Sequence, residues 1–480
     1  MSTQAVTPQS VDFSAWYNEI VYKAGLCDLS PVRGCLIIKP YGYELWEAIK
    51  GGLDRRFKAT GHQNAYFPLF IPESFLKREA EHVEGFSPEL AVVTIAGGKE
   101  LEEPLVVRPT SETIIMESFK NWIQSYRDLP LLINQWANVV RWELRTRPFL
   151  RTTEFLWQEG HTAHATFEEA EAETMQMLNV YADFAITDAA IPVVKGKKSD
   201  REKFAGALYT YTIEAMMGDK RALQSGTSHN LGQNFAKAFD IKFLDEANQL
   251  QNPWTTSWGL STRMIGAIVM THGDDKGLRL PPTVAPFQLV IVPIYKNDDE
   301  KSAVMEAVGR ISQELLAANI RITVDKREGV SPGFKFNDWE MRGVPARLEI
   351  GPKDVANGTA ALARRDVPGK EGKQFVPQEG IVARVQDLLK SIQANMLQQA
   401  TVFRDANIHD VNSYDALKQV IEAGGWARGW WGGTGDDEAR IKEETGATIR
   451  CFPFEQPGGN GVCFYSGAQA EQVALFARAY

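Results

Sequence analysis

Three prolines within residues 278–287, LRLPPTVAPF, constrain the fold of this chain more than any other feature. Proline fixes its own φ angle and lacks an N–H donor, so a helix or an inner strand rarely continues through such a segment. The hydrophobic pattern also changes here. Because 480 residues are too many for one ordinary core, we expect two to four domains, with one boundary at these prolines.

Strand and helix patterns alternate after the prolines. The run FQLVIVPI (287–294) predicts a buried strand, residues 298–319 an amphipathic helix, and IRITVD (320–325) a second strand. The alternation continues to a helix pattern near residues 381–392. The whole series of strands and helices predicts a compact α/β domain. From about Gln399 one helical pattern is mixed with Gly- and Trp-rich loops, which indicates a smaller C-terminal unit.

The residues before the prolines mix helices with long strand patterns. Residues 41–58 have apolar residues at helical spacing, and the aromatic run 61–72 follows as a strand. INQWANVVRWELR (133–145) predicts another strand, and Thr166 with Glu169 predicts a capping box at a helix start. WGLSTRMIGAIVMTHG (258–273) is typical of a helix packed against a sheet.

The composition narrows the class of protein. With 44% hydrophobic and 24% charged residues, the chain is expected to be globular. The net charge of −9 argues against nonspecific nucleic-acid binding, and the apolar runs are too short to span a membrane. The N-terminus has no basic region followed by an apolar one, so we expect no secretion. Four irregularly spaced cysteines indicate a reducing cytoplasm.

Arginines are concentrated in residues 141–161, RWELRTRPFLRTTEFLWQEGH, although the chain is acidic. On a strand, Arg141 and Glu143 would share one face. Arginine suits phosphate, and glutamate can accept hydrogen bonds from an exocyclic amine, so the pair would suit a nucleotide. A structural salt bridge across the sheet is the alternative, and for this pair alone it is favoured.

Other polar segments leave similar alternatives. Thr110 and Glu112 in RPTSET could hold a substrate ammonium, but a helix start capped by Thr110 or Ser111 is favoured for this segment alone. Ser228 and His229 lie in LQSGTSHNLGQNF, which is typical of a ligand-lining loop. A nucleophilic pair is disfavoured there, because adjacent residues rarely face each other and no nucleophile-elbow sequence accompanies them.

An arginine and a metal-like cluster complete the candidates. Arg263 follows small and apolar residues and needs an anion, which either a ligand or paired carboxylates would supply. His272, Asp274 and Asp275 have the spacing of neither a zinc site nor a calcium loop, so a turn is favoured.

Taken in order, these segments resemble the class II aminoacyl-tRNA synthetases, and specifically the prolyl-tRNA synthetase family. Residues 41–68 match the first class motif, RWE through RTTEFLWQE the second, and GLSTR the third. RPTSE, GTSH, WGLS and HGDDKGLRLPP match the prolyl family, and the resemblance covers essentially the whole chain. It implies an α+β catalytic domain with a class II antiparallel sheet (1–283), an α/β anticodon-binding domain (284–398) and a small α+β C-terminal domain (399–480).

The resemblance implies a ligase that activates L-proline with ATP and Mg²⁺, then charges tRNA(Pro). Arg141 and Arg263 are the catalytic residues that it implies. The proline-binding set is Thr110, Glu112, Arg141, Trp157 and His229. The ATP-binding set is Arg141, Glu143, Thr152, Phe155, Gln224, Thr227, Ser261 and Arg263. The anticodon set is Trp339, Glu340, Arg342, Arg347 and Lys353. Arg145, Arg147 and Arg151 would contact the outer phosphates or the tRNA acceptor end.

Two departures from the family follow from the sequence. The four positions of the family's zinc site fall on Gly432, Asp437, Cys463 and Ser466, so the C-terminal domain is zinc-binding-like but lacks most ligands, and we expect no structural zinc. About 100 residues separate the second and third motifs, too few for an editing insertion, so we expect the archaeal and eukaryotic-like form. A cytoplasmic homodimer without a membrane segment is expected.

Three rival functions are weighed against this expectation. The first is a class II synthetase for another amino acid. The second is a noncatalytic, synthetase-like tRNA-binding protein, although such proteins usually lose the motif arginines, and Arg141 and Arg263 are present. The third is a hydrolase that uses Ser228 and His229.

Overall fold

The computed structural model describes residues 5–77 and 90–480, and the first four residues of the N-terminal segment lie outside these ranges. A mostly antiparallel sheet forms the centre, with the strand order β20-β21-β25-β22-β9-β10-β11-β14-β8-β7-β3. Its strands are β3 (Gln63–Asn64), β7 (Leu131–Val140), β8 (Glu154–His164), β9 (Val193–Lys197), β10 (Tyr209–Met216), β11 (Ala222–Gly232), β14 (Trp254–Ser261), β20 (Ile408–Asp410), β21 (Trp426–Trp430), β22 (Thr448–Pro453) and β25 (Val473–Ala477).

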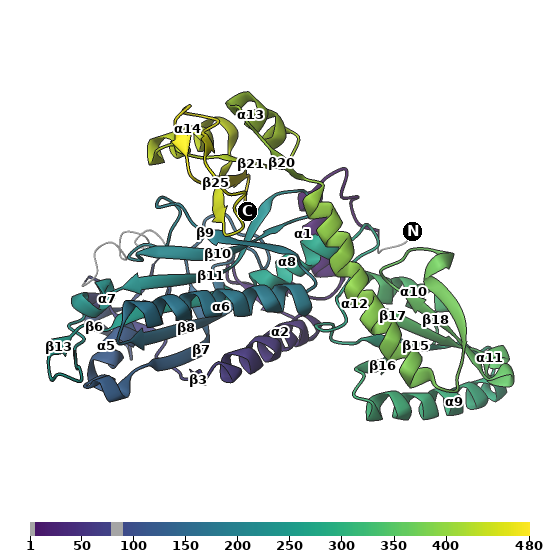
Figure 1. Cartoon of the computed structure of the whole chain (residues 1–480). Coiled ribbons are helices and arrows are strands. Elements are labelled where there is room, and N and C mark those ends of the chain that lie inside the picture. Colours follow the sequence, from purple (N-terminus) through teal and green to yellow (C-terminus); the bar gives the residue numbers. More distant parts are fainter. Residues whose placement is uncertain (1–4, 78–89) are drawn as a thin grey trace.

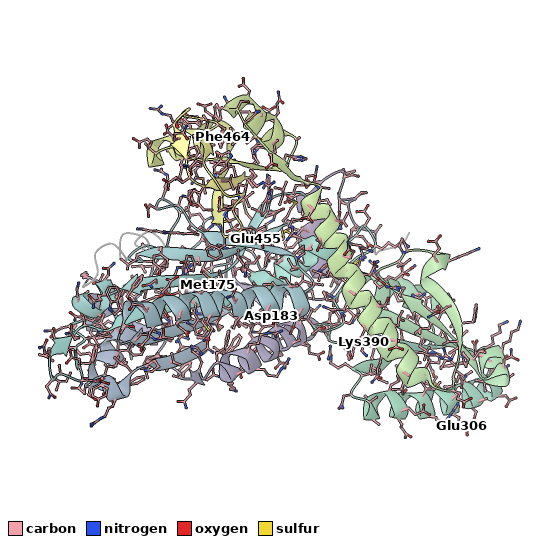
Figure 2. All side chains as sticks on the ribbon, in the orientation of Figure 1. Met175, Asp183, Glu306, Lys390, Glu455 and Phe464 are labelled. Carbon is pink, nitrogen blue, oxygen red and sulfur yellow. The ribbon has the colours of Figure 1, made fainter. Side chains whose placement is uncertain are left out.

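Helices cover one face of this sheet, where α6 runs along the strands beside α2 (Figure 1). Met175 and Asp183 mark the outer side of α6 in Figure 2. The helices of this part are α1 (Phe13–Lys23), α2 (Pro40–Ala59), α3 (Glu73–Leu76), α5 (Glu112–Trp122), α6 (Phe167–Thr187), α7 (Asn234–Ala238) and α8 (Arg263–His272). Small ladders and a short 3₁₀ turn complete it: β1 (Cys27–Leu29), β2 (Leu36–Ile38), β4 (Phe70–Pro72), β5 (Ala91–Ala96), β6 (Lys99–Val107), η2 (Tyr126–Asp128), β12 (Phe243–Leu244) and β13 (Leu250–Gln251).

Trp258 of β14 joins the sheet to its helices. Its buried ring lies 5.0 Å from Phe57 of α2 and 6.3 Å from Tyr181 of α6, measured between centroids. Gly160 on the neighbouring strand β8 allows this packing, because a Cβ there would lie 2.0 Å from the Trp258 ring. Trp258 therefore identifies the face of the sheet that packs against α2 and α6.

An α/β domain follows the prolines, as predicted. Its sheet has the order β16-β15-β17-β18-β19, and Glu306 and Lys390 mark exposed positions of α9 and α12 (Figure 2). The elements are β15 (Leu289–Pro293), α9 (Asp298–Ala317), β16 (Ile322–Val324), α10 (Pro332–Met341), β17 (Ala346–Ile350), α11 (Pro352–Asn357), β18 (Thr359–Arg364), η3 (Lys370–Gly372), β19 (Lys373–Pro377) and α12 (Ile381–Asp405).

The C-terminal residues extend the central sheet. β22 pairs with β9, so the C-terminal residues and the residues before the prolines share one sheet. The remaining C-terminal elements are α13 (Tyr414–Glu422), α14 (Gly435–Thr445), β23 (Gly461–Val462) and β24 (Gln469–Ala470). The domain limits at 283/284 and 398/399 stay predictions, and the second falls inside α12, which runs from the α/β domain toward the C-terminal domain (Figure 1).

The structure corrects three local predictions. The strand predicted over 133–145 ends at Val140, because the following residues form the loop to β8, so Arg141 and Glu143 do not lie on a strand. WGLS belongs to strand β14, and the helix begins only at Arg263. Thr166 caps α6 as predicted, but the Glu169 carboxylate accepts from the Ala165 amide, so the capping box is incomplete. No helix among residues 5–77 and 90–480 is both long and apolar enough to cross a membrane.

Candidate active site

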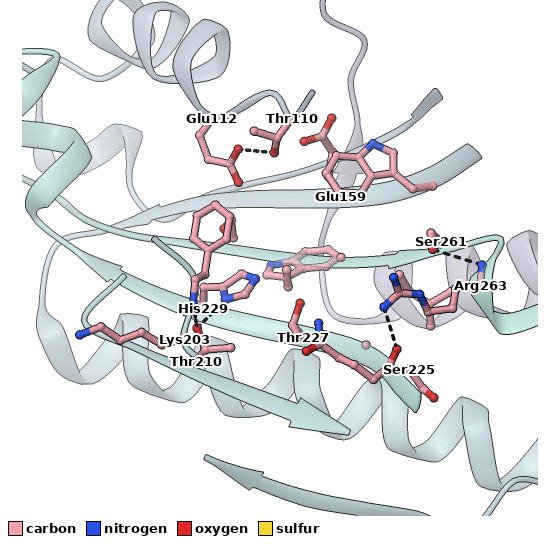
Figure 3. A pocket seen from close by; sticks show the side chains of 18 of the residues that line it. Thr110, Glu112, Glu159, Lys203, Thr210, Ser225, Thr227, His229, Ser261 and Arg263 are labelled. Carbon is pink, nitrogen blue, oxygen red and sulfur yellow. Dashed lines mark hydrogen bonds between the residues drawn. The ribbon is translucent and has the colours of Figure 1, made fainter. Parts of the chain in front are cut away.

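A pocket lies on the polar face of the central sheet, between strands β8, β10, β11 and β14 and the start of α5. In Figure 3, Lys203 and His229 stand at one end of it and Ser261 and Arg263 at the other. Most predicted site residues line it: Thr110, Glu112, Arg141, Phe155, Trp157, Gln224, Thr227, His229, Ser261 and Arg263. The remaining two, Glu143 and Thr152, line an adjoining cavity that shares Arg141 and Arg263 with the first. The pocket thus joins residues from segments more than 150 positions apart.

Thr110 and Glu112 form a buried corner of the pocket. The Thr110 hydroxyl donates a hydrogen bond to the Glu112 carboxylate, and both side chains are at most 4% exposed (Figure 3). Ser111 is the N-cap residue of α5, but its hydroxyl donates to Glu159 (2.5 Å) instead of accepting from the helix. The side-chain cap favoured from the sequence is therefore wrong, and the corner has the residue types that a substrate ammonium requires.

Glu159 and His161 form a second layer that the sequence reasoning missed. The His161 Nε2 lies 2.9 Å from Glu159 Oε2, and Gln135 Nε2 donates to the same carboxylate at 2.9 Å. Burial acts to lower the pKa of His161, but the Glu159 carboxylate raises it above its ordinary value. Side chains two residues apart on β8 share one face, so Glu159 and His161 lie on the same face as Trp157, and this spacing would have predicted them as pocket residues.

His229 forms the wall opposite the corner. Its Nδ1 is hydrogen-bonded to Thr210 Oγ1 at 2.9 Å, and its ring lies 4.6 Å from that of Phe204. Burial, together with the neighbouring His161, lowers the pKa of His229 to about 3, so the imidazole is neutral at physiological pH. Ser228 directly precedes His229 on β11, and its side chain points to the opposite face of the sheet, because neighbouring residues on a strand alternate between the two faces. A Ser228–His229 nucleophilic pair is therefore excluded by geometry.

Arg141 lies just beyond the end of β7. Its Nε donates to the Pro109 carbonyl at 3.0 Å, and its guanidinium carbon lies 5.5 Å from the ring centroids of Phe155 and Trp157. Glu143 instead approaches Arg151, whose Nε is 3.6 Å from Glu143 Oε1. The aromatic rings and the carbonyl thus hold the Arg141 guanidinium at the pocket wall.

Arg263 sits at the far end, at the start of α8. Its Nε donates to the Leu150 carbonyl at 3.2 Å, and its Nη1 lies 3.5 Å from the Gln224 carbonyl. Within the described ranges, no carboxylate forms an ion pair with it, so the paired-carboxylate alternative is wrong. Burial, then the neighbouring cations Arg151 and Arg141, lower the pKa of Arg263 to about 10. This end of the pocket is therefore electropositive.

The other nucleotide candidates lie around these arginines. Ser261 Oγ accepts from the Arg263 amide at 3.2 Å, and Thr152 Oγ1 donates to the Glu154 carbonyl at 2.7 Å. Among the loop arginines, Arg147 is held against the ring of Tyr480, with its guanidinium carbon 5.0 Å from the ring centroid, whereas Arg145 is exposed.

The metal alternative near residue 272 fails. His272 Nε2 lies 2.9 Å from the Ala189 carbonyl, and Asp274 accepts from Arg365 at 2.6 and 2.7 Å. Asp274 and Gly277 close a turn, as predicted. Residues 5–77 and 90–480 contain no cluster of three or more His, Cys, Asp or Glu side chains suited to a metal.

The predicted anticodon residues are only partly gathered. Trp339, Glu340 and Arg347 line one cavity of the α/β domain, with Arg347 Nη1 3.5 Å from Glu340 Oε1. Arg342 lines a neighbouring cavity and lies 5.1 Å from the Trp339 ring centroid. Lys353 is an exposed residue of α11 and lines neither cavity.

The four zinc-like positions of the C-terminal domain carry one thiol. Cys463 Sγ accepts from the Ser466 amide at 3.4 Å, while the Asp437 carboxylate accepts from Thr434 at the start of α14. Gly432 offers no side-chain ligand, and a tetrahedral zinc site requires four. Cys451 is fully buried, and burial raises its pKa to about 12, as expected of a core thiol.

Comparisons with known proteins agree with this arrangement. The chain matches the class II tRNA synthetase core domain (G, H, P, S and T) over residues 93–272, an anticodon binding domain over 288–388, and the prolyl-tRNA synthetase C-terminal domain over 414–480. It is 61% identical to the proline–tRNA ligase of Roseiflexus castenholzii, across 100% of both chains.

Two further relatives are similar over nearly the whole length. The chloroplastic/mitochondrial proline–tRNA ligase of Arabidopsis thaliana is 59% identical, covering 100% of this chain and 89% of the relative. The proline–tRNA ligase of Bacteroides fragilis is 55% identical over 99% of both. With its class II core, its anticodon-binding domain and its C-terminal domain, the chain belongs to the proline–tRNA ligase family, the prolyl-tRNA synthetases.

Proposed function

We propose that the chain joins L-proline to ATP and then to tRNA(Pro). In the first step a proline carboxylate oxygen attacks the α-phosphorus of ATP, and the bond to the leaving pyrophosphate breaks. The substrate carboxylate is the nucleophile, so no covalent enzyme intermediate is required. Catalysis then consists mainly of positioning and of stabilising charge on the phosphates.

One observation carries the proposal: Arg141 and Arg263 line the same pocket as the buried polar corner formed by Thr110 and Glu112. In our assignment Arg141 contacts the α-phosphate and the proline carboxylate, and Glu143 accepts from the adenine amino group. Phe155 and Arg263 stack on the two faces of adenine. Further nucleotide contacts come from Thr152, Gln224, Thr227 and Ser261. Magnesium bound to the ATP would neutralise the charge of its phosphates.

The amino-acid end is assigned to the residues around Glu112. Its carboxylate and the Thr110 hydroxyl receive the secondary ammonium of proline, while Trp157 and the neutral His229 enclose the ring. The lowered pKa of His229 supports this role, because an uncharged imidazole does not repel the ammonium. The apolar faces of Trp157 and Phe204 suit a saturated ring.

In the second step a hydroxyl of the terminal ribose of tRNA(Pro) attacks the carbonyl carbon of the adenylate, the bond to the phosphate breaks, and AMP leaves. We assign anticodon recognition to the α/β domain, with Glu340 and Arg347 at base edges. Trp339, whose ring is buried and whose indole N–H donates to Asp325, supports the wall of their cavity. Arg342 and Lys353 complete the assigned set, although they lie outside the cavity that holds the other three.

We also propose the form of the enzyme. Between β8 and β14 the chain forms α6, strands β9, β10 and β11, α7 and the small β12–β13 ladder, which supports an archaeal and eukaryotic-like enzyme without an editing insertion. Such an enzyme leaves Ala-tRNA to be deacylated elsewhere; rapid deacylation of Ala-tRNA(Pro) by the purified protein would refute this. A cytoplasmic homodimer is expected, and light scattering at the mass of a single chain would contradict the dimer.

No structural zinc is assigned to the C-terminal domain, because only Cys463 of the four aligned positions is a thiol. Elemental analysis of the purified protein checks this: we expect no stoichiometric zinc, and one zinc per chain would overturn the assignment.

Proline-dependent ATP–pyrophosphate exchange tests the function, followed by charging of tRNA(Pro). Exchange with proline and not with threonine, serine or histidine is the expected result. A noncatalytic tRNA-binding protein is the alternative; it would bind tRNA without exchange with any amino acid.

A further inference from the structure

Residues 198–208, between β9 and β10, form one wall of the active-site pocket, and we call them the wall segment. Glu202, Lys203 and Phe204 line the pocket, and Phe204 packs on His229 with their planes 32° apart. Any displacement of the wall segment therefore changes the amino-acid end of the pocket.

The C-terminal domain holds the beginning of the wall segment. Ser199 Oγ donates a hydrogen bond of 2.8 Å to Glu438 Oε2, which belongs to the first turn of α14. Ser199 is 4% exposed, and its carbonyl accepts from the amides of Glu202 (3.1 Å) and Lys203 (3.0 Å). One residue thus connects α14 to the two positions that precede Phe204.

A buried ion cluster also holds Lys198, the first residue of the wall segment. Glu214 is fully buried between Lys198, whose Nζ lies 2.8 Å from Oε1, and Arg450, whose Nε and Nη2 lie 3.0 Å from Oε2. Arg450 belongs to β22, and on the same strand Phe452 pairs with Lys197 of β9. Because removing one member of a buried ion cluster is costly, the start of the wall segment is held firmly to the C-terminal domain.

We propose that the C-terminal domain positions the amino-acid pocket, and that Glu438, acting through Ser199, is a positioning residue for proline binding. This inference rests on the proposed function, since it concerns the amino-acid end of the same pocket. Glu438 lines neither cavity of the active site, so it acts on the substrate through the wall segment.

The residues assigned to proline and those assigned to ATP lie at different ends of the pocket. The wall segment and His229 stand at one end of the pocket, whereas Ser261 and Arg263 stand at the other (Figure 3). Loss of the Ser199–Glu438 hydrogen bond therefore raises the KM for proline and leaves the KM for ATP unchanged. A residue that merely stabilised the fold would change both constants or neither.

Steady-state ATP–pyrophosphate exchange with the full-length protein tests this. Ser199→Ala and Glu438→Ala should each raise the proline KM by about five-fold, the range of a single hydrogen bond. Glu438→Gln retains an acceptor oxygen and should restore most of the wild-type value. The double variant should equal either single variant, because both remove the same contact.

Glu443→Ala is the matched control, since Glu443 is exposed on the same helix. Thermal unfolding of every variant accompanies the kinetics. An unchanged proline KM in both alanine variants overturns the inference, as does an equal rise of both KM values with a lower unfolding temperature. Absence of proline-dependent exchange in the wild type refutes the proposed function itself.

Discussion

The catalytic pocket and the cavity of the α/β domain both contain arginines, but they balance the charge differently. Arg347 of the α/β domain has carboxylate partners, Glu340 at 3.5 Å and Glu349 at 3.1 Å. Arg263 of the catalytic pocket contacts backbone carbonyls and lies near Arg141 and Arg151. The cavity of the α/β domain therefore presents paired charges, whereas the catalytic pocket accumulates positive charge that an anionic ligand would neutralise.

Removal of Arg141 should give the largest effect. Arg141→Ala takes one donor from the phosphate end, and we expect exchange activity to fall by about 10³-fold, as when a preorganised oxyanion donor is removed. The fold should survive, because Arg141 lies in a loop. Arg384→Ala, at an exposed position of α12, is the control. Wild-type exchange in Arg141→Ala would refute its role.

Arg263→Met should lower activity without lowering stability, which would show that the unpaired positive charge of the catalytic pocket serves the ligand. We expect exchange to fall by about 10²-fold or more, while the thermal unfolding temperature stays the same or rises. The physical reason is that a half-buried cation without an ion-paired carboxylate among the described residues costs folding free energy in the absence of ligand. A fall of the unfolding temperature by several degrees would mean that its hydrogen bonds to Leu150 and Gln224 outweigh that cost.

In the α/β domain, Glu340→Ala should affect only the tRNA step. We expect kcat/KM for charging of tRNA(Pro) to fall by about ten-fold, the discrimination that a side chain at a base edge supplies. Exchange without tRNA should be unchanged. Lys390→Ala, exposed on α12 of the same domain, is the control. An equal loss of tRNA-independent exchange in Glu340→Ala would contradict the assignment of amino-acid activation and tRNA recognition to different domains.

The last prediction concerns the pH dependence of stability. The folded pKa of His229, about 3, lies below the ordinary value of about 6.5, so the unfolded chain binds more protons between these limits. Stability is therefore lost as pH falls below about 6.5. From pH 7 to pH 5 this single group should cost about 2 kcal/mol. His229→Asn should show a shallower decline in urea titrations, and parallel declines would contradict the assignment.

The sequence was sufficient to predict several of the residues that line the pocket, but not Glu159, His161 or Phe204. Thr110, Glu112, Arg141, His229 and Arg263 come from separate segments, and their order along the chain indicated the family before any geometry was known. The strand alternation of β8 would also have led to Glu159 and His161. The roles assigned to these residues stay predictions.

Other features depend on contacts that no local pattern carries. The pairing of β22 with β9 and the Lys198–Glu214–Arg450 cluster join residues more than 230 positions apart. The end of β7 at Val140 was missed because the apolar and aromatic pattern continues through Trp142, which is exposed in the loop. The long-range contacts of β22 and the end of β7 depend on tertiary packing and on where the chain reverses, which local propensity does not encode.

Detection of prolyl-adenylate is the most direct test of the claim that the pocket performs activation. The purified protein is mixed with L-proline and Mg–ATP in the absence of tRNA, and the bound products are analysed by mass spectrometry. We predict prolyl-adenylate together with released pyrophosphate, both formed about 10³-fold more slowly with Arg141→Ala. Turnover of ATP to ADP and phosphate, or no adenylate with the wild-type protein, would contradict the account.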